Sequence, residues 1–214
     1  MRLAGKYLLP DSDTYFSPFF ESSEGFQLDH LQSALKHVSP FDCAIDGGAH
    51  VGSWTLKMLE KFKTVWSIEP ASDTFECLKR NIETHAENSE SVHLINAALG
   101  ASISRGSIVD DTTRQGNTGS RFLKEFEEGN IQIITIDSLC LEKLDFLKLD
   151  VEGFEYYALL GAEKTIKETR PTILIEEKGF GRRYDLQPFA ASELLKSWGA
   201  RCVTTIGKDH VFVF

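Results

Sequence analysis

A glycine-rich turn at residues 46–52 constrains this chain more than any other stretch of its sequence. Apolar residues at 43–45 end in Asp46, and Gly47, Gly48 and Gly52 follow before a helical pattern begins. A strand, a tight turn and a helix in this order are typical of the ligand-binding edge of open α/β sheets. Glycine lets the backbone approach a ligand because it carries no Cβ atom. We therefore predict a ligand-binding turn at this position.

The spacing of these glycines differs from the dinucleotide-binding pattern. A G-x-G-x-x-G motif that began at Gly47 would need a glycine at position 49, where the chain has Ala49. The turn therefore favours an adenosine-type ligand without a firm pyrophosphate cradle, and S-adenosylmethionine fits this description better than NAD. The predicted cofactor contacts in the turn are Asp46, Gly47, Gly48, Ala49, His50, Gly52 and Ser53.

Length, composition and charge define the class of protein. A chain of 214 residues is expected to form one domain with a small extension, here an N-terminal cap with one helix at 1–40 and a main domain at 41–214. The net charge of −9 argues against nucleic-acid binding. No apolar run approaches the ~18 residues of a membrane span, so we expect a soluble, cytoplasmic protein that binds no membrane. The four cysteines are scattered and are expected to be reduced core thiols.

Strands and helices alternate along the main domain. Strands are predicted at 42–46, 64–69, 91–95, 144–150, 172–176, 201–206 and 210–214. Helices are predicted at 25–38, 52–62, 71–87, 154–168 and 190–198. Strands separated by helices imply a doubly wound α/β fold with a parallel sheet. The link between the last two strands is too short for a parallel crossover, so these strands form an antiparallel hairpin.

Two segments do not follow this alternation. Residues 1–24 show little periodicity, and Phe16, Phe19 and Phe20 could pack on the main domain as a lid. The long link at 100–136 contains a loop at 114–119 that is flexible by composition, flanked by β segments at 107–109 and 131–136. A loop of this length in a compact domain is often functional.

The ends of the first three strands carry the predicted nucleoside contacts. Glu69 follows Asp46 at close to the spacing of about 20 residues at which a carboxylate binds the ribose of a nucleotide. We expect both acids to face a common cleft, with Asp46 near the methionyl group; a solvated acid is the alternative for Glu69. Asn96 and Ala97 end the third strand and leave room for a flat base, and Pro70 completes the predicted contacts.

The fourth and fifth strands end in further acids. Asp150, Glu152 and Glu155 lie at or just before a helix start, where capping is the simple explanation, and Glu176 ends the next strand together with Glu177. Because Asp150 lies beside the glycine turn, it could also face the cofactor's sulfonium or take a proton from a hydroxyl. The candidate catalytic residues are Asp150, Glu152 and Glu176. If these three converge, their oxygens would suit Mg²⁺, although the sequence does not require a metal.

Two further features have simple structural explanations. His50 is a candidate base, but a polar loop residue is the more common role for a lone histidine. The basic pair Arg182 and Arg183 could bind an anionic substrate, although a solvated loop is the alternative.

Several of these motifs occur together in one known family. They are the glycine turn at 46–52, the pair Glu69 and Pro70, and the segments 96–100, 135–139, 147–155, 160–162 and 170–176. Over about residues 41–178 the chain resembles the FkbM family of S-adenosylmethionine-dependent methyltransferases. The resemblance implies a Rossmann-like class I methyltransferase fold, with seven strands of which the last is antiparallel. His50 stands where family members commonly carry asparagine, and no family motif precedes residue 41.

The expected function is S-adenosylmethionine-dependent O-methylation of a hydroxyl on a sugar, glycan or small metabolite. One alternative is an N-methyltransferase of nucleic acid or protein, but the Asn/Asp-Pro-Pro-Tyr tetrapeptide of amino-methylating enzymes is absent. Another is a non-catalytic domain that only binds the cofactor. The presence of Asp46, Glu69 and Asp150 argues against it.

Overall fold

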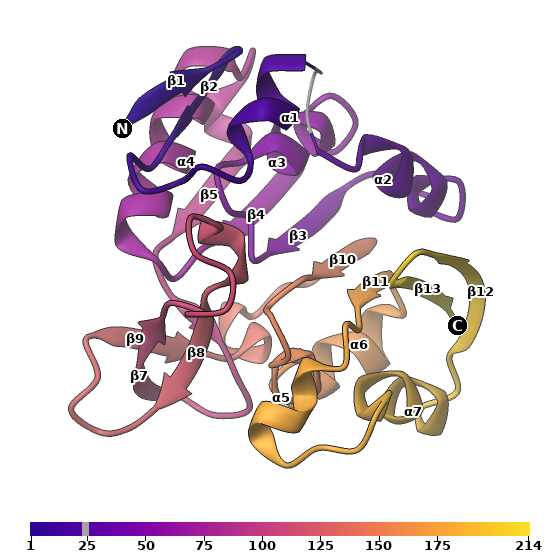
Figure 1. Cartoon of the computed structure of the whole chain (residues 1–214). Helices are drawn as coiled ribbons and strands as arrows, with labels where there is room; N and C mark the ends of the chain where they lie inside the picture. Colours follow the sequence, from indigo (N-terminus) through magenta and orange to yellow (C-terminus); the bar gives the residue numbers. More distant parts are fainter. Residues whose placement is uncertain (23–25) are drawn as a thin grey trace.

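A computed structural model describes residues 1–22 and 26–214, and its centre is a seven-stranded mixed sheet (Figure 1). The strand order is β12-β13-β11-β10-β3-β4-β5. Strand β13 pairs antiparallel with β11 and β12, and the other pairs are parallel. This arrangement confirms the predicted fold class and the terminal hairpin. The strands are β3 (Cys43–Gly47), β4 (Thr64–Ile68), β5 (Val92–Ile95), β10 (Phe146–Leu149), β11 (Thr172–Glu176), β12 (Arg201–Ile206) and β13 (Asp209–Val213).

Helices pack on both faces of the sheet, because alternate residues of each buried strand point to opposite sides. Ile45 and Leu147 face the core under α5, α6 and α7, whereas Ala44 and Phe146 face the core under α2 and α3. The α-helices are α1 (Ser17–Ser22), α2 (Leu28–Leu35), α3 (Ser53–Leu59), α4 (Ser72–His85), α5 (Glu155–Leu160), α6 (Glu163–Thr169) and α7 (Ala190–Ser197). Short 3-10 helices are η1 (Ser89–Ser91), η2 (Thr118–Ser120), η3 (Ile136–Leu139) and η4 (Phe180–Tyr184).

The helix predicted at 154–168 is wrong in one respect, since two helices, α5 and α6, replace it. The break lies at Gly161, where a Cβ atom would lie 2.0 Å from the carbonyl oxygen of Gly100. Asp137 accepts hydrogen bonds from the backbone N–H groups of Lys164 and Thr165 at 3.2 and 2.8 Å, which caps the start of α6. Contacts from distant loops therefore divide a pattern that is helical throughout.

The N-terminal region is more ordered than the sequence suggests. Strands β1 (Arg2–Ala4) and β2 (Tyr7–Leu9) form a hairpin that packs with α1 against α4 (Figure 1). The described part of residues 1–40 therefore contains two helices and a hairpin rather than one helix. The helix predicted at 25–38 corresponds to the shorter α2. Residue 25, where that prediction began, lies outside the described residues, as do residues 23 and 24 of the irregular segment.

The link at 100–136 forms most of a second sheet instead of a long loop. Its four strands, in the order β6-β9-β7-β8, are β6 (Ala98–Leu99), β7 (Ser104–Val109), β8 (Phe122–Glu125) and β9 (Ile131–Ile134). Figure 1 shows this sheet to one side of the main one. The irregular part is thus confined mainly to residues 110–121, which contain η2 and the glycines expected to make a loop.

The four cysteines are free, as predicted, but only Cys43 and Cys77 are buried. Cys140 and Cys202 are exposed, so the prediction of core thiols is wrong for these two. In the described part of the chain, none of the helices has the length and apolar character that a membrane crossing requires.

A buried ion pair joins the two central strands. Asp46 and Lys148 are register partners on β3 and β10, and their side chains lie on the same face of the sheet. The Lys148 ammonium lies 3.0 Å from Asp46 Oδ1 and donates a hydrogen bond to the Gly48 carbonyl oxygen at 2.7 Å. Burial opposes the charge on Lys148, but Asp46 and Asp150 raise its pKa above the ordinary value. The ammonium therefore stays charged in the core.

Breaking this pair should destabilise the fold. We expect Lys148→Met to lower the free energy of unfolding by about 3–5 kcal/mol, because it leaves the Asp46 carboxylate buried without a partner. The double variant Asp46→Asn with Lys148→Met should recover part of this loss. Urea denaturation at neutral pH measures both. Lys63→Met, which breaks the exposed pair with Asp42, is the control and should change little; a Lys148→Met variant as stable as this control would contradict the prediction.

Candidate functional site

A cavity of about 720 Å³ opens where the carboxyl ends of β3, β4, β10 and β11 meet. This is the edge at which open α/β sheets bind ligands, and the volume is in the usual range for small-molecule sites. Acids and bases line it together with aromatic side chains. The residues that form its walls include Phe16, Phe20, Phe26, Gly48, Ala49, His50, Ser53, Trp54, Glu69, Pro70, Ala97, Lys148, Asp150, Glu152, Glu176 and Lys178.

The glycine turn lines one wall of the cavity. Gly48 has a φ angle of +73°, and a Cβ atom at this position would lie 1.9 Å from the Asp150 carbonyl oxygen. The backbone N–H groups of Gly48 and Ala49 both donate to the Ile68 carbonyl oxygen, at 2.9 and 3.1 Å. The turn is therefore fixed to β4 and packs closely on the end of β10. Gly47 and Gly52 support the turn but are not among the lining residues.

Glu69 points into the cavity from the end of β4. Its two carboxylate oxygens accept hydrogen bonds from the backbone N–H groups of His50 at 3.0 Å and Ala71 at 2.9 Å. These two hydrogen bonds stabilise the charged form, but burial outweighs them and raises the pKa of Glu69 to about 7. The carboxylate thus changes charge near neutral pH while lying on the cavity wall.

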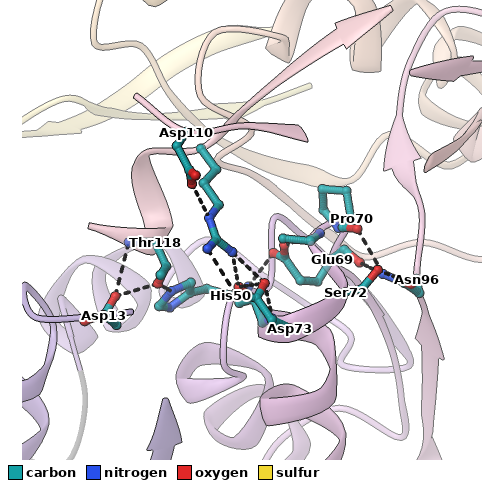
Figure 2. A network of polar contacts seen from close by, with 12 residues as sticks. Asp13, His50, Glu69, Pro70, Ser72, Asp73, Asn96, Asp110 and Thr118 are labelled. Atoms are coloured by element: carbon teal, nitrogen blue, oxygen red, sulfur yellow. Dashed lines mark hydrogen bonds and ion pairs between the residues drawn. The ribbon is translucent and has the colours of Figure 1, made fainter. Parts of the chain in front are cut away.

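Asn96 braces the Glu69 turn from outside. Its side-chain NH₂ donates to the carbonyl oxygens of Glu69 and Pro70 at 2.8 and 3.1 Å (Figure 2). The side chain is exposed and is not among the residues of the cavity wall, whereas Pro70 and Ala97 are. Asn96 therefore supports the turn that carries Glu69, and its contact with a base stays a prediction.

The expectation that Asp46 shares a cleft with Glu69 is wrong. Asp46 is fully buried beneath the cavity, where it pairs with Lys148 and accepts a hydrogen bond from Thr55 Oγ1 at 2.7 Å. Its position on β3 directs the side chain under α3, and Lys148, one strand away, lines the cavity instead. The floor therefore presents an ammonium group and not a carboxylate.

Three acids converge on the cavity wall, a possibility that the sequence raised. Asp150 and Glu176 directly follow the last paired residues, Leu149 and Ile175, of two neighbouring parallel strands. One oxygen each from Asp150, Glu152 and Glu176 lies within 4.8 Å of the others. Two negative charges this close repel by about 3–4 kcal/mol at an effective dielectric constant near 20. The arrangement therefore needs a cation, a proton or both.

Lys178 provides that cation. Its ammonium lies 3.7 Å from Asp150 and 2.9 Å from Glu152, and it contacts Glu176 directly. Burial disfavours the charge on Asp150, but Lys178, a hydrogen bond from Glu176 and Lys148 lower the pKa of Asp150 to about 2. Burial and the neighbouring Asp150 raise the pKa of Glu176. At neutral pH the site thus holds an ionised Asp150 beside a protonated Glu176.

The N-terminal segment and the 110–121 loop are joined over the cavity near His50. Thr118 donates its hydroxyl proton to Asp13, and His50 Nε2 lies 2.8 Å from the same hydroxyl oxygen (Figure 2). His50 must then donate through Nε2. Burial lowers the pKa of His50 to about 4, so the ring is neutral. His50 thus joins the glycine turn to the N-terminal segment and the 110–121 loop, which is a different role from that of the base considered from the sequence.

Two of the three phenylalanines expected to form a lid do line the cavity. Phe16 and Phe20 lie on its wall, and the Phe16 ring centre is 4.7 Å from that of His50. Phe19 is 40% exposed and lies against Tyr15 and Phe26 instead.

The other acids near the site are structural. Glu155 accepts hydrogen bonds from the backbone N–H groups of Val151 and Gly153, which fixes the turn after β10. Glu177 accepts from the N–H of Ala191 and from the Ser192 hydroxyl at the start of α7. Neither residue faces the cavity.

Arg183 is held by contacts within the protein. Its guanidinium pairs with Asp111 and donates to the Glu152 carbonyl oxygen at 3.1 Å. It also stacks on the rings of Phe122 and Phe180, with 4.4 and 4.3 Å to the ring centres. Arg183 therefore fixes the loop after β11 to the 110–121 loop.

A family model described as the methyltransferase FkbM domain matches residues 46–202. This chain belongs to that family. The curated "Methyltransferase 1" of Beauveria bassiana (strain ARSEF 2860) is 24% identical over 168 residues, which cover 65% of this chain and 67% of that protein.

Solved structures share the fold. The FkbM methyltransferase of Methylobacillus flagellatus KT has a TM-score of 0.55 at 18% identity, over 93% of this chain and 52% of that one. This chain thus spans about half the length of that protein. A Streptococcus mutans protein solved in complex with SAH has a TM-score of 0.51 at 13% identity, over 88% and 97% of the two chains.

Sequence reasoning missed several residues of the cavity wall, above all Lys148, Lys178 and Thr118. One signal was available for Lys148, because a charged residue inside the apolar strand 146–149 needs a partner on the same face. Trp54 is buried in the core beside α2 and also lines the cavity, and its indole N–H donates a hydrogen bond to the Phe26 carbonyl oxygen at 2.8 Å. The positions of Lys178 and Thr118 depend on loops, for which periodicity gives no signal.

The close packing at Gly48 gives a test of the turn. Gly48→Ala should destabilise the protein more than Gly199→Ala, because both residues have positive φ angles but only the first would also bring a Cβ into contact with the backbone. An alanine with a positive φ angle costs both variants a similar backbone strain of about 1–2 kcal/mol. Any further loss of stability in Gly48→Ala therefore reports the clash of its Cβ with Asp150. Chemical denaturation of both variants measures this difference; equal losses would contradict the described packing.

Proposed function

We propose that this chain is an S-adenosylmethionine-dependent O-methyltransferase that acts on a hydroxyl group of a sugar, glycan or small metabolite. The observation that carries the proposal is that one cavity is lined both by the buried Glu69, beside the Gly48 turn, and by the ionised Asp150. Family membership supports methyl transfer as the class of reaction, and the SAH complex of the S. mutans protein supports the choice of cofactor.

The residues on the cavity wall fit this cofactor. Gly48 and Ala49 of the glycine turn line the cavity, where a glycine at position 48 lets the turn pack against the Asp150 backbone. Glu69 lies on the cavity wall, and each of its carboxylate oxygens, which accepts one backbone N–H, would accept a further hydrogen bond from a ribose hydroxyl. Pro70 and Ala97 offer small, flat surfaces for the base. The Lys148 ammonium would attract the carboxylate of the methionyl group.

When bound, the cofactor supplies an electrophilic methyl group. An alcohol is a weak nucleophile until its proton is removed, so the chain must offer a base at the cavity wall. Asp150 is the best candidate, because its side chain is 32% exposed and ionised, whereas Glu152 and Glu176 are 6% exposed. Asp150 would accept the hydroxyl proton, and the cavity walls would hold the acceptor in place.

The cavity walls also suit a polyhydroxylated acceptor. Phe16, Phe26 and Trp54 present aromatic surface, on which the apolar face of a sugar ring can pack, and these rings exclude water from the reacting groups. Glu152 and Asp209 lie on the same cavity wall and could accept hydrogen bonds from further hydroxyls. These features support a sugar or related small molecule as the acceptor.

Cofactor affinity should depend on the charge of Glu69. Its pKa lies near 7 because of burial, and the ionised form is the better acceptor of two hydroxyl donors. We therefore expect the affinity for S-adenosylhomocysteine to rise as the pH increases through about 7 and then to level off. Glu69→Gln should weaken binding roughly tenfold (about 1.4 kcal/mol) and flatten this pH dependence. Calorimetry at several pH values tests both, and a wild-type profile as flat as that of the variant would contradict the role of Glu69.

Asp150 should be needed for turnover rather than for binding. We expect Asp150→Asn to lower the rate of methyl transfer by about 10²–10⁴-fold, with S-adenosylhomocysteine binding retained. The assay follows methylated product by mass spectrometry over a panel of sugars and small metabolites. Glu177→Gln, at the end of β11 but directed toward α7, is the control and should keep its activity. Unchanged turnover in Asp150→Asn would remove Asp150 as the base.

A further inference from the structure

The acid cluster of Asp150, Glu152 and Glu176 has the composition of a binding site for a hard divalent cation. One oxygen of each residue lies within 4.8 Å of the others, and Glu152 and Glu176 are almost completely buried. Oxygen atoms alone are the ligands that Mg²⁺ and Ca²⁺ prefer. Apart from ion pairs with basic side chains and the contact between the carboxyl groups of Glu176 and Asp150, Asp150 Oδ1, Glu152 Oε2 and Glu176 Oε2 have no hydrogen-bond partner in the described part of the chain.

The centre of this cluster already holds a positive charge that belongs to the protein. The ammonium of Lys178 lies 2.9 Å from Glu152 and 3.7 Å from Asp150 and contacts Glu176. Lys178 follows Glu176 by two residues, just beyond the end of β11, and its side chain is only 25% exposed. A divalent ion among the same oxygens would lie within a few ångströms of this ammonium, so like charges would repel strongly.

We propose that Lys178 is the built-in cation of this site: its ammonium takes the place of a divalent metal ion among Asp150, Glu152 and Glu176, and removing it creates a metal site. The proposal rests on the proposed function in one respect, because it makes methyl transfer by this chain independent of divalent metals. Lys178 acts as a positioning residue, since it holds the three carboxyl groups together and keeps Asp150 charged at the cavity wall.

Lys148 also lowers the pKa of Asp150, but its ammonium is paired with Asp46. The other basic residues nearby do not hold the three acids together. Lys208 also lines the cavity, but it lies in the turn between β12 and β13. Arg114 stacks on the Phe180 ring, 4.7 Å from its centre. Arg183 is 3.9 Å from Glu152 and is held mainly by Asp111. Lys208→Met therefore removes one positive charge from the same wall while leaving the acid cluster intact, which makes it a matched control for Lys178→Met.

The test is Mn²⁺ binding, followed by electron paramagnetic resonance in the absence of cofactor. We expect wild-type protein, Lys178→Arg and Lys208→Met to show no binding stronger than about 1 mM, a weak affinity for such sites. Lys178→Met should bind Mn²⁺ at least about tenfold more tightly, because three carboxyl groups are then available to one ion. The double variant Lys178→Met with Glu152→Gln should lose this gain.

Each outcome decides the proposal. Tight Mn²⁺ binding by the wild-type protein would overturn it whatever the variants do, as would a folded Lys178→Met protein that binds no better than Lys208→Met. Thermal melting tests whether Lys178→Met is folded. If that variant does not fold, Lys178→Gln, which keeps a polar group at this position, takes its place in the experiment. Unchanged methyl transfer in the presence of a chelator is also expected, and a loss of activity that Mg²⁺ restores would contradict metal independence.

This test and that of the proposed function can fail separately. Metal binding needs neither cofactor nor acceptor, so a gain in Lys178→Met would support the built-in cation even if S-adenosylhomocysteine failed to bind. Conversely, a protein that binds S-adenosylhomocysteine but shows no gain of Mn²⁺ affinity would keep the proposed function and refute the role of Lys178.

Discussion

The register between β3, β10 and β11 is the constraint on which the rest of the site depends. It places Asp46 opposite Lys148, and it places Asp150 and Glu176 side by side where the two strands end. A shift by one residue would exchange the two faces of the strand and bury these charges among apolar side chains. The ion pair of Asp46 and Lys148 opposes such a shift, since each charge is buried and has its partner only in this register.

Charge is balanced in layers around the cavity. Beneath it, Asp46 neutralises Lys148, whose ammonium faces the cavity floor. On the wall, Lys178 lies among three acids and leaves Asp150 as the accessible ionised group. Glu69, in contrast, has no ion-pair partner among the described residues and is stabilised by two backbone N–H groups.

The part of the cavity wall near His50 is built from segments that lie far apart in the sequence. Backbone N–H groups of Thr14 and Tyr15 donate to the Gly116 carbonyl oxygen at 2.8 and 3.0 Å. Together with the contacts of Asp13 and Thr118, they join the N-terminal segment to the loop of the second sheet. Because His50 of the glycine turn makes a hydrogen bond with Thr118, these two segments are also bonded to the turn. These contacts therefore fix three parts of the chain that line the cavity to one another.

The sequence by itself determined the strands of the main sheet, the presence of helices on both faces, the terminal hairpin and the edge of the sheet where the site lies, because these depend on local periodicity, turn residues and link length. It also raised the possibility that Asp150, Glu152 and Glu176 converge, since residues at the carboxyl ends of neighbouring parallel strands share one edge. Only the tertiary structure decided which acids face the ligand. Asp46 and Glu69 both end strands, but α3 and Lys148 bury Asp46, while the backbone of the glycine turn holds Glu69 at the cavity wall. Lys178, Thr118 and the break at Gly161 also depend on contacts between loops distant in sequence, which no local pattern encodes.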